Sequence, residues 1–293
     1  MNNHISSQQQ KPKFSQAITT QSYQKLISNT LGDPERCKRF VAAITSAVAV
    51  NKDLQECESG TILAGALLGE SLNLSPSPQL GQYYLVPFND NKAGTKRANF
   101  ILGYKGYIQL AIRSGQYKSL NVLEIKEGEL VNFNPLTEEI KVNLIEDYSL
   151  RDSTPTIGYY AMFEYLNGFR KAIYWSKEKM LSHADKFSAA FRAADYQRLA
   201  NGEIPDKELW KYSSYWYQDF DSMAKKTLLR QLISHWGVMS LEMQTAIESD
   251  NTSMIIGKDG RITSEGLERS DSEGIVQDEE PVQMIQHASL EDF

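Results

Sequence analysis

Asn167 and Gly168 separate two apolar segments, and this dipeptide constrains the fold more than any other feature of the sequence. An Asn-Gly pair favours a tight turn with positive φ angles, and such a turn joins two neighbouring antiparallel strands. Strands are therefore predicted over Thr156–Tyr165 and Phe169–Trp175, on either side of the pair. The chain is thus expected to contain an antiparallel sheet that includes this hairpin.

Strand-like and helix-like segments follow one another along the rest of the chain, which predicts an α+β fold. Further strands are expected over Tyr83–Phe88, Ala98–Leu102, Asn121–Lys126 and Glu139–Ile145. Helices are expected over Pro34–Val50 (with Asp33 as N-cap), Gly60–Leu72, Gly103–Ser114 and Asp221–Trp236. The first two strands flank a polar loop, Asn89–Arg97, whose tip is expected to carry Lys92, Lys96 and Arg97. Trp175 and Trp210 are assigned to the core.

Charge is unevenly distributed along the chain, which has a formal net charge of −6 at pH 7. Residues 250–293 contain 11 acidic and 3 basic residues, so this segment alone has a net charge of −8. Residues 92–126 contain seven basic residues and one acidic residue, a net charge of +6. A basic segment of this kind is typical of proteins that bind polyanions, although a solvated basic surface gives the same pattern.

Composition also divides the chain into three parts. Residues 1–15 are polar and Gln-rich and are predicted to form a disordered arm, whereas residues 16–249 have the patterning of a folded domain. Residues 250–293 are acidic and poor in large apolar residues, so we expect a flexible linker followed by a short C-terminal segment. No apolar run approaches the ~18–20 residues that span a bilayer, and Cys37 and Cys57 give no disulfide framework, so a cytoplasmic protein is expected.

The sequence contains no recognisable enzyme signature. The four histidines are scattered singly, no zinc-type cluster of His and Cys occurs, and no Walker A loop follows the glycines near Gly65. Asp219 and Asp221 could hold magnesium as a nuclease pair, but carboxylates in this position more often cap the helix that follows. We therefore expect a binding protein that is not an enzyme and that uses neither a metal site nor ATP.

Binding chemistry is indicated where a predicted strand meets the helix that begins at Gly103. Lys105 lies near the start of this helix, where free N–H groups and the helix dipole favour a phosphate, and Arg113 lies two turns later. Tyr104 and Tyr107 could stack on bases, which together with a basic track is how single strands are held without sequence preference. The alternative is that both tyrosines belong to the core or its rim.

A second basic segment lies in the helix predicted over Asp221–Trp236. Lys226 and Arg230 are four residues apart on its flank, whereas Lys225 falls within the apolar stripe. A lysine in that position needs a partner, so a phosphate contact and a structural salt bridge are both open for Lys225. The other candidate DNA contacts are Lys96, Arg97, Lys118, Lys186, Arg192 and Lys211.

Four sequence motifs, taken together and in their order along the chain, indicate a family. They are Gly69-Glu70-Ser71-Leu72-Asn73-Leu74, Tyr83-Tyr84-Leu85-Val86-Pro87-Phe88, Gly103-Tyr104-Lys105-Gly106-Tyr107 with Arg113-Ser114-Gly115, and the basic segment from Phe220 to Arg230. Together they resemble the phage RecT family of single-strand annealing proteins. The resemblance covers roughly residues 20–240, and the Gly-Tyr-Lys-Gly run with its spacing to Arg-Ser-Gly is fairly specific.

The resemblance implies an α+β fold with a Rad52-like core of antiparallel sheet packed with helices. The flexible acidic tail after Asp250 is expected from composition alone, since that segment matches no pattern of the family. The resemblance also implies ATP-independent annealing of single-stranded DNA and strand invasion in phage homologous recombination, by a homo-oligomer that forms a ring or a helical filament. The partners would be single-stranded DNA, the annealed duplex, and, through the C-terminal segment, a 5′–3′ exonuclease and the host single-strand-binding protein. Mg²⁺ would assist annealing only through the DNA, and the setting would be the cytoplasm of a bacterial host with a phage or prophage gene.

Two other functions stay open. The chain could be a non-annealing mediator that binds single strands and loads another recombinase, or a nuclease that uses Asp219 and Asp221. Residues 250–293 could also be an inert solubilising tail rather than a partner-binding segment. In either case, deleting residues 250–293 is expected to preserve the annealing of naked oligonucleotides.

Overall fold

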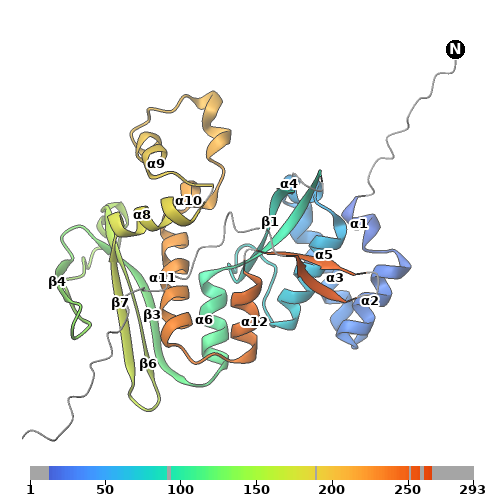
Figure 1. The fold of residues 1–293 in the computed structure, drawn as a ribbon, viewed down its shortest axis with the longest axis horizontal. Helices are drawn as coiled ribbons and strands as arrows, with labels where there is room; N and C mark the ends of the chain where they lie inside the picture. The colour runs from blue at the N-terminus through green and yellow to red at the C-terminus, as the bar shows by residue number, and fades with distance from the viewer. Residues whose placement is uncertain (1–12, 91–93, 189, 251, 258–260, 266–293) are drawn as a thin grey trace, which may run out of the picture.

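The hairpin predicted around Asn167 is present and belongs to a three-stranded antiparallel sheet. The structure is a computed structural model that describes residues 13–90, 94–188, 190–250, 252–257 and 261–265 (Figure 1). The central strand β6 (Thr156–Tyr165) pairs with β7 (Arg170–Ser176) on one side and with β3 (Tyr117–Lys126) on the other. Gly168 has a φ of +86°, as the predicted turn requires, but Asn167 is not among the residues with positive φ, so the turn has one left-handed residue rather than two.

Both faces of this sheet are covered. The long helix α11 (Phe220–Trp236) packs on one face, and its core contacts include Tyr159 and Phe163 of β6. The opposite face is covered by a small hairpin of β4 (Leu130–Asn134) and β5 (Glu139–Val142), where Tyr160 and Ala172 are buried. Because both faces of β6 are largely covered, this strand is apolar at almost every position instead of alternating.

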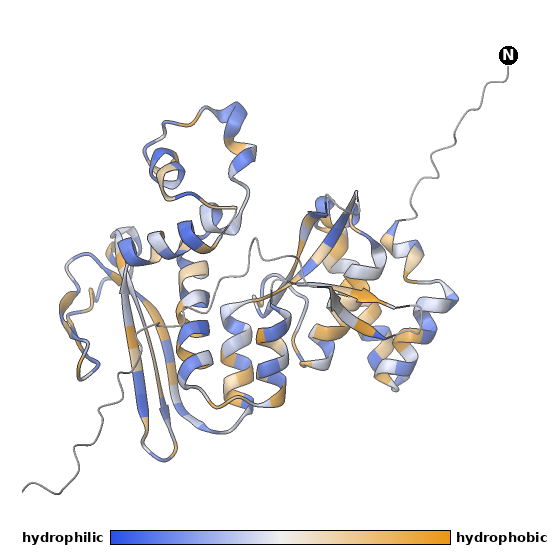
Figure 2. Cartoon of the chain, in the orientation of Figure 1, coloured by the Kyte–Doolittle hydropathy of each residue, from blue (hydrophilic) through white to orange (hydrophobic). Residues whose placement is uncertain are grey.

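A second sheet, with four strands, lies beside the three-stranded sheet and α11. Its strand order is β1 (Tyr83–Asp90), β2 (Thr95–Leu102), β8 (Thr252–Ile256) and β9 (Ile262–Glu265). The apolar helix α5 (Ser59–Ser71) packs against this sheet, and a Cβ added at Gly69 would lie 2.4 Å from the ring of Tyr83. The close approach explains why small residues are needed on this helix, and Figure 2 shows α5 as strongly apolar.

The remaining elements connect or cover these two sheets. The N-terminal helices are α1 (Phe14–Ala17), α2 (Gln21–Leu31), α3 (Pro34–Ala49) and α4 (Lys52–Gln55). The others are α6 (Tyr104–Arg113), α7 (Tyr148–Ser153), α8 (Lys177–Phe187), α9 (Ala193–Ala200), the 3-10 helix η1 (Asp206–Tyr212), α10 (Tyr215–Gln218) and α12 (Leu241–Ser249). Within the described ranges, every helix is too short or too polar to cross a bilayer.

The predicted α+β class, with antiparallel sheets packed by helices, is confirmed. Asp33 caps α3 as expected, because its carboxylate accepts hydrogen bonds from the backbone N–H groups of Glu35 and Arg36. The boundary predicted at Asp250 is wrong, since β8 and β9 follow it and β8 pairs with β2. The arm predicted over residues 1–15 is also too long, since α1 begins at Phe14; residues 1–12 and 266–293 lie outside the described residues.

Candidate nucleic-acid interface

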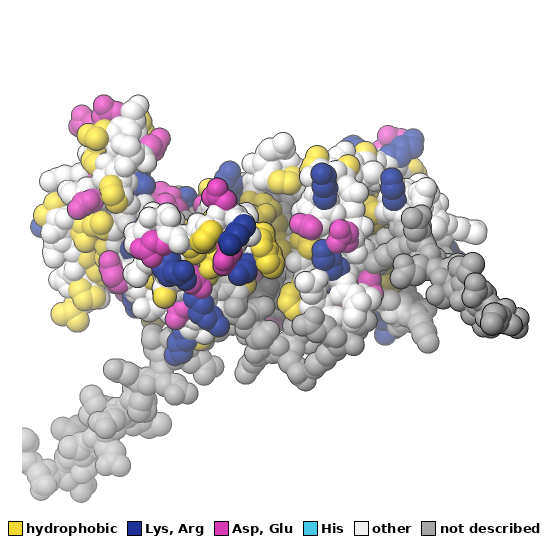
Figure 3. Space-filling view, turned by 90° about the horizontal axis from the view of Figure 1, so that it is seen from above, with side chains coloured by type: hydrophobic (Ala, Val, Ile, Leu, Met, Phe, Trp, Pro, Cys, Tyr) yellow, Lys and Arg dark blue, Asp and Glu magenta, His cyan; other side chains and the backbone are white. Residues whose placement is uncertain are grey.

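Three lysines of α8 each lie over an aromatic ring. The distances from Nζ to the ring centroid are 6.0 Å for Lys177 and Tyr196, 4.6 Å for Lys179 and Trp175, and 5.1 Å for Lys186 and Phe187. Lys179 and Lys186 are exposed, and none of the three lysines makes an ion pair with a described residue. Figure 3, which shows the whole molecule from above, has basic, acidic and hydrophobic side chains side by side on this surface. We call these three lysines and their rings the α8 surface.

The histidine beneath the α8 surface reports a positive electrostatic environment. His183 is buried between Trp175 and Phe187, with ring centroids 5.2 Å and 4.7 Å away. Burial, and to a smaller extent the positive charges of Lys179, Arg230 and Lys186, together lower the pKa of His183 to about 4. The charges that contribute to this shift are all cations, as expected beneath the lysines of the α8 surface.

The depressed pKa of His183 predicts how stability depends on pH. Between its usual pKa of 6.5 and about 4, the unfolded chain binds a proton that the folded protein does not. Stability that is present at neutral pH is therefore lost as the pH falls through this window, by up to about 3 kcal/mol. His183→Phe should flatten this dependence, because Nε2 has no hydrogen-bond partner among the described residues and the pocket is aromatic.

Urea denaturation between pH 7 and pH 4.5 measures this difference. The exposed His235 provides the control, and His235→Gln should keep the pH dependence of the wild type. Equal pH dependence in the wild type and in His183→Phe would show that His183 is not the group that resists protonation.

The two basic segments predicted from the sequence meet at Tyr104 and Lys225. Tyr104 is the first residue of α6, and its ring centroid lies 5.0 Å from Nζ of Lys225 in α11. Lys225 also forms an ion pair with Glu124 of β3 at 2.6 Å. Burial alone would lower the pKa of Lys225, but the hydrogen bond and charge of Glu124 outweigh it and raise that pKa. The salt-bridge alternative is therefore realised, while a phosphate contact of Lys225 stays a prediction.

Further aromatic side chains extend from this meeting point. The rings of Tyr84 in β1 and Tyr215 in α10 lie 5.7 Å apart. The side chains of Tyr84 and Lys105 both pack against Gly81. A Cβ added at Gly81 would lie 3.0 Å from Oη of Tyr84 and 3.4 Å from Cδ of Lys105. Lys105 is exposed and makes no ion pair with a described residue, which keeps it a candidate phosphate contact. Sequence reasoning missed Tyr84, because nothing in a strand pattern distinguishes it from its buried neighbour.

Trp210 was assigned to the core, and this prediction is wrong. Its side chain is 73% exposed on η1, close in sequence to the exposed Tyr215. An exposed tryptophan is a side chain on which an unpaired base can stack.

Lys226 and Arg230 do not fit their predicted role as phosphate contacts. They are only 5% and 9% exposed, and both pair with the buried carboxylate of Asp250 at 3.1 Å. The same carboxylate accepts the backbone N–H of Leu102 at 2.9 Å. This buried cluster therefore joins α11 to the end of α12 and to β2, and it is structural.

Tyr107 is buried, whereas Arg113 and Arg192 are exposed side chains that hydrogen-bond to the backbone, so DNA contacts by the two arginines stay predictions. Tyr107 is fully buried in the core, so it cannot stack on bases in this conformation. The guanidinium of Arg113 donates to the carbonyl oxygens of Leu72 and Asn73, each at 2.6 Å, and so binds the end of α5. Arg192 donates in the same way to backbone carbonyls in its own loop.

The remaining candidates form ion pairs. Lys96 and Arg97 lie within β2 rather than at the tip of the hairpin, and Lys92 lies outside the described residues. The pairs are Lys96 with Glu56 at 2.5 Å, Arg97 with Asp90 at 3.2 Å, Lys118 with Glu164 at 2.6 Å, and Lys211 with Glu208 at 3.0 Å. Exposed pairs contribute only about 0–1 kcal/mol, so a phosphate can displace the carboxylate. DNA contacts by Lys118 and Lys211, the more exposed of these side chains, therefore stay predictions.

Both carboxylates of the alternative nuclease site have structural partners. Asp219 caps α11 by accepting the backbone N–H of Ser222 at 3.1 Å. Asp221 accepts hydrogen bonds from the hydroxyls of Tyr159 at 2.5 Å and Thr156 at 3.2 Å. Among the described residues, no group of three or more His, Cys, Asp or Glu side chains could hold a metal ion.

An antiparallel α+β scaffold that holds lysines over partly exposed rings has the features of a protein that binds single-stranded nucleic acid. A family model described as the RecT family matches residues 38–265. The chain is 38% identical over 246 residues to the uncharacterized protein YqaK of Bacillus subtilis strain 168, which covers 84% of this chain and 75% of that protein. It is 26% identical over 215 residues to protein RecT of Escherichia coli K12, which covers 73% of this chain and 71% of RecT.

The chain belongs to the RecT family, since the family model spans well over half of it. Membership assigns it to DNA binding and to DNA recombination by single-strand annealing. It also implies that the protein binds single strands and assembles into oligomers.

Proposed function

We propose that the protein anneals complementary single strands and promotes strand invasion in homologous recombination without hydrolysing ATP. The observation that carries this proposal is the α8 surface, where Lys177, Lys179 and Lys186 lie over aromatic rings. Ammonium groups bind phosphates without regard to sequence, and exposed rings support unpaired bases. A surface of this kind suits a single strand of any sequence.

Annealing follows physically from such binding. When the backbone is held from one side, the edges of the bases stay free to meet a complementary strand. Base pairing then supplies both the specificity and the driving force, so neither a nucleotide nor catalysis is needed, and Mg²⁺ acts only by screening the DNA. One protomer of modest charge cannot hold strands in register over many bases, so successive protomers must extend the surface.

The test is to mix two labelled complementary oligonucleotides with the full-length protein in the absence of nucleotide. Energy transfer between the labels should rise many times faster than in the spontaneous reaction, and added ATP should not change the rate. Non-complementary strands give the background. Tight binding of single strands without faster annealing would favour the mediator function instead, and cleavage of labelled DNA with Mg²⁺ would favour the nuclease.

We further propose that residues 266–293 bind protein partners, namely a 5′–3′ exonuclease and the single-strand-binding protein of the bacterial host. This segment contains eight acidic residues and one basic residue, so it repels DNA and is free to bind proteins. The proposed setting is the bacterial cytoplasm, with a phage or prophage as the source of the gene.

The structure changes where a tail deletion should begin. Removing residues 266–293 should leave the annealing of naked oligonucleotides unchanged, because the two sheets and the α8 surface remain. Removing residues 250–293 should instead unfold the protein, because it removes β8, β9 and Asp250. Annealing assays on the shorter deletion, with circular dichroism on both, check these outcomes. Loss of annealing in a folded 266–293 deletion would contradict the proposed division of roles.

A further inference from the structure

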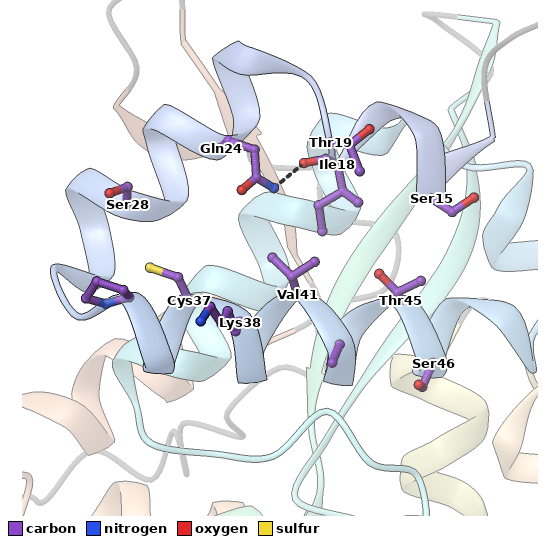
Figure 4. A pocket seen from close by; sticks show the side chains of 12 residues that line it. Ser15, Ile18, Thr19, Gln24, Ser28, Cys37, Lys38, Val41, Thr45 and Ser46 are labelled. Carbon is purple, nitrogen blue, oxygen red and sulfur yellow. Dashed lines mark hydrogen bonds between the residues drawn. The ribbon is translucent and has the colours of Figure 1, made fainter.

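A groove lies at one end of the molecule, between the α1–α2 turn and α3. Its volume is about 750 Å³, and it includes apolar side chains of Ile18, Val41 and Ala42 with hydroxyls and Lys38 around them (Figure 4). Gln24 Nε2 donates to the backbone oxygen of Ile18 at 2.7 Å and fixes the turn at one side. We call this hollow the N-terminal groove.

An apolar projection lies at the other end of the longest axis, where β4 is labelled in Figure 1. It consists of the β4–β5 hairpin and α7, and we call it the acidic hairpin. Leu136, in the turn of the hairpin, is 93% exposed. The other large apolar side chains exposed in this segment are Val131, Leu144, Tyr148 and Leu150. So many exposed apolar side chains within 20 residues mark a surface that binds another molecule.

The two ends carry opposite charge. Residues 127–152, which contain the acidic hairpin, have seven acidic and two basic residues, a net charge of −5. Two of the seven acids have partners within the protein, since the buried Glu129 pairs with Arg151 and Glu138 pairs with Lys171. Residues 13–49, which form the N-terminal groove, have five basic and two acidic residues, a net charge of +3. Glu139 and Glu146 are exposed, and neither makes an ion pair with a described residue. Opposite potentials attract the unlike ends of two copies and disfavour contact between like ends.

We propose that the acidic hairpin of one copy docks into the N-terminal groove of the next. Leu136 enters the groove against Val41 and Ala42, and Glu139 approaches Lys38. Because the two surfaces differ and lie at opposite ends of the long axis, the contact is head-to-tail and repeats from copy to copy. Such repetition closes a ring or extends a helix, depending on the rotation between copies. The inference deepens the proposed function, since it supplies the contact that extends the α8 surface along a strand.

Sedimentation velocity of the full-length protein, with and without a single-stranded oligonucleotide, tests the contact. The wild type should form assemblies, and Leu136→Ser should shift the population towards the monomer. Leu241→Ser is the matched control, because Leu241 is 77% exposed in α12, away from both surfaces, and it should assemble like the wild type. Both leucines are exposed, so folding should be unaffected.

Charge reversal gives a stricter test. Lys38→Glu and Glu139→Lys should each weaken assembly, and the double variant should restore it, because each interface then again joins opposite charges. Lys38 pairs with Glu35 in its own copy at 2.8 Å, but both side chains are exposed, so the loss of this pair costs little stability. Any one of three results would overturn the proposal. Leu136→Ser could assemble as the wild type does, the double variant could fail to recover assembly, or the wild type could be monomeric with and without the oligonucleotide.

Annealing measured on the same samples separates this inference from the proposed function. Monomeric wild-type protein that anneals strands would overturn the docking and leave the proposed function intact. Assemblies that respond to the variants as predicted but do not anneal would support the docking and contradict the proposed function.

Discussion

Replacing Asp250 by alanine is expected to destabilise the folded protein by about 3–5 kcal/mol. The carboxylate is buried, and it holds Lys226 and Arg230 at 3.1 Å as well as the backbone N–H of Leu102. Removing it leaves two buried cations without their shared partner, and this desolvation cost is far greater than the loss of an exposed pair. Equilibrium urea denaturation at pH 7 measures the change in the free energy of unfolding.

Asp152→Ala is the matched control, because Asp152 is exposed and makes no ion pair with a described residue. Its effect should stay within about 0.5 kcal/mol. A loss below about 1 kcal/mol for Asp250→Ala would contradict the buried cluster. The result also decides how other variants are interpreted, since weaker DNA binding by Lys226→Ala would report damage to the fold and not a lost phosphate contact.

Replacing Lys177, Lys179 and Lys186 together by alanine is expected to weaken binding to single-stranded DNA and to flatten its salt dependence. Each phosphate contact on a single strand contributes about 0.7 to the slope of log K against log salt, so the triple variant should lose about 2. Fluorescence anisotropy of a labelled oligonucleotide over a range of salt concentrations measures this slope. None of these lysines is fully buried or forms an ion pair with a described residue, so the fold should survive.

Single variants sharpen the comparison. Lys179→Ala should lower the slope by about 0.7, whereas Lys25→Ala, an equally exposed lysine in α2 at the far end of the molecule, should leave it unchanged. Equal slopes for both variants would mean that the α8 surface contributes no more than general surface charge.

Local signals in the sequence predicted a large part of the fold. The Asn167-Gly168 turn and the Asp33 cap are each determined by a few neighbouring residues, and both are present. The structure brings Tyr104 and Lys225, from two basic segments far apart in the sequence, into contact range. No local rule connects α6 to α11, so neighbouring residues alone could not predict this contact.

Buried partners explain the errors in the predicted site. Asp250 lies where the composition turns acidic, so it was assigned to a tail, although it follows Arg230 by only one helix and neutralises it. Tyr104 and Tyr107 are three residues apart on one helix, yet only Tyr107 points fully into the core. Such differences depend on which neighbouring element covers a face, and that information is not local in the sequence.

The annealing rate without nucleotide tests most directly whether this protein pairs strands through its α8 surface. Complementary labelled oligonucleotides are mixed with the wild type, the triple lysine variant or Lys25→Ala at equal protein concentration. The wild type and Lys25→Ala should anneal them far faster than the spontaneous rate, and the triple variant should fall towards that rate while keeping its circular dichroism. A wild type no faster than the spontaneous reaction, or a triple variant as fast as the wild type, would contradict the account.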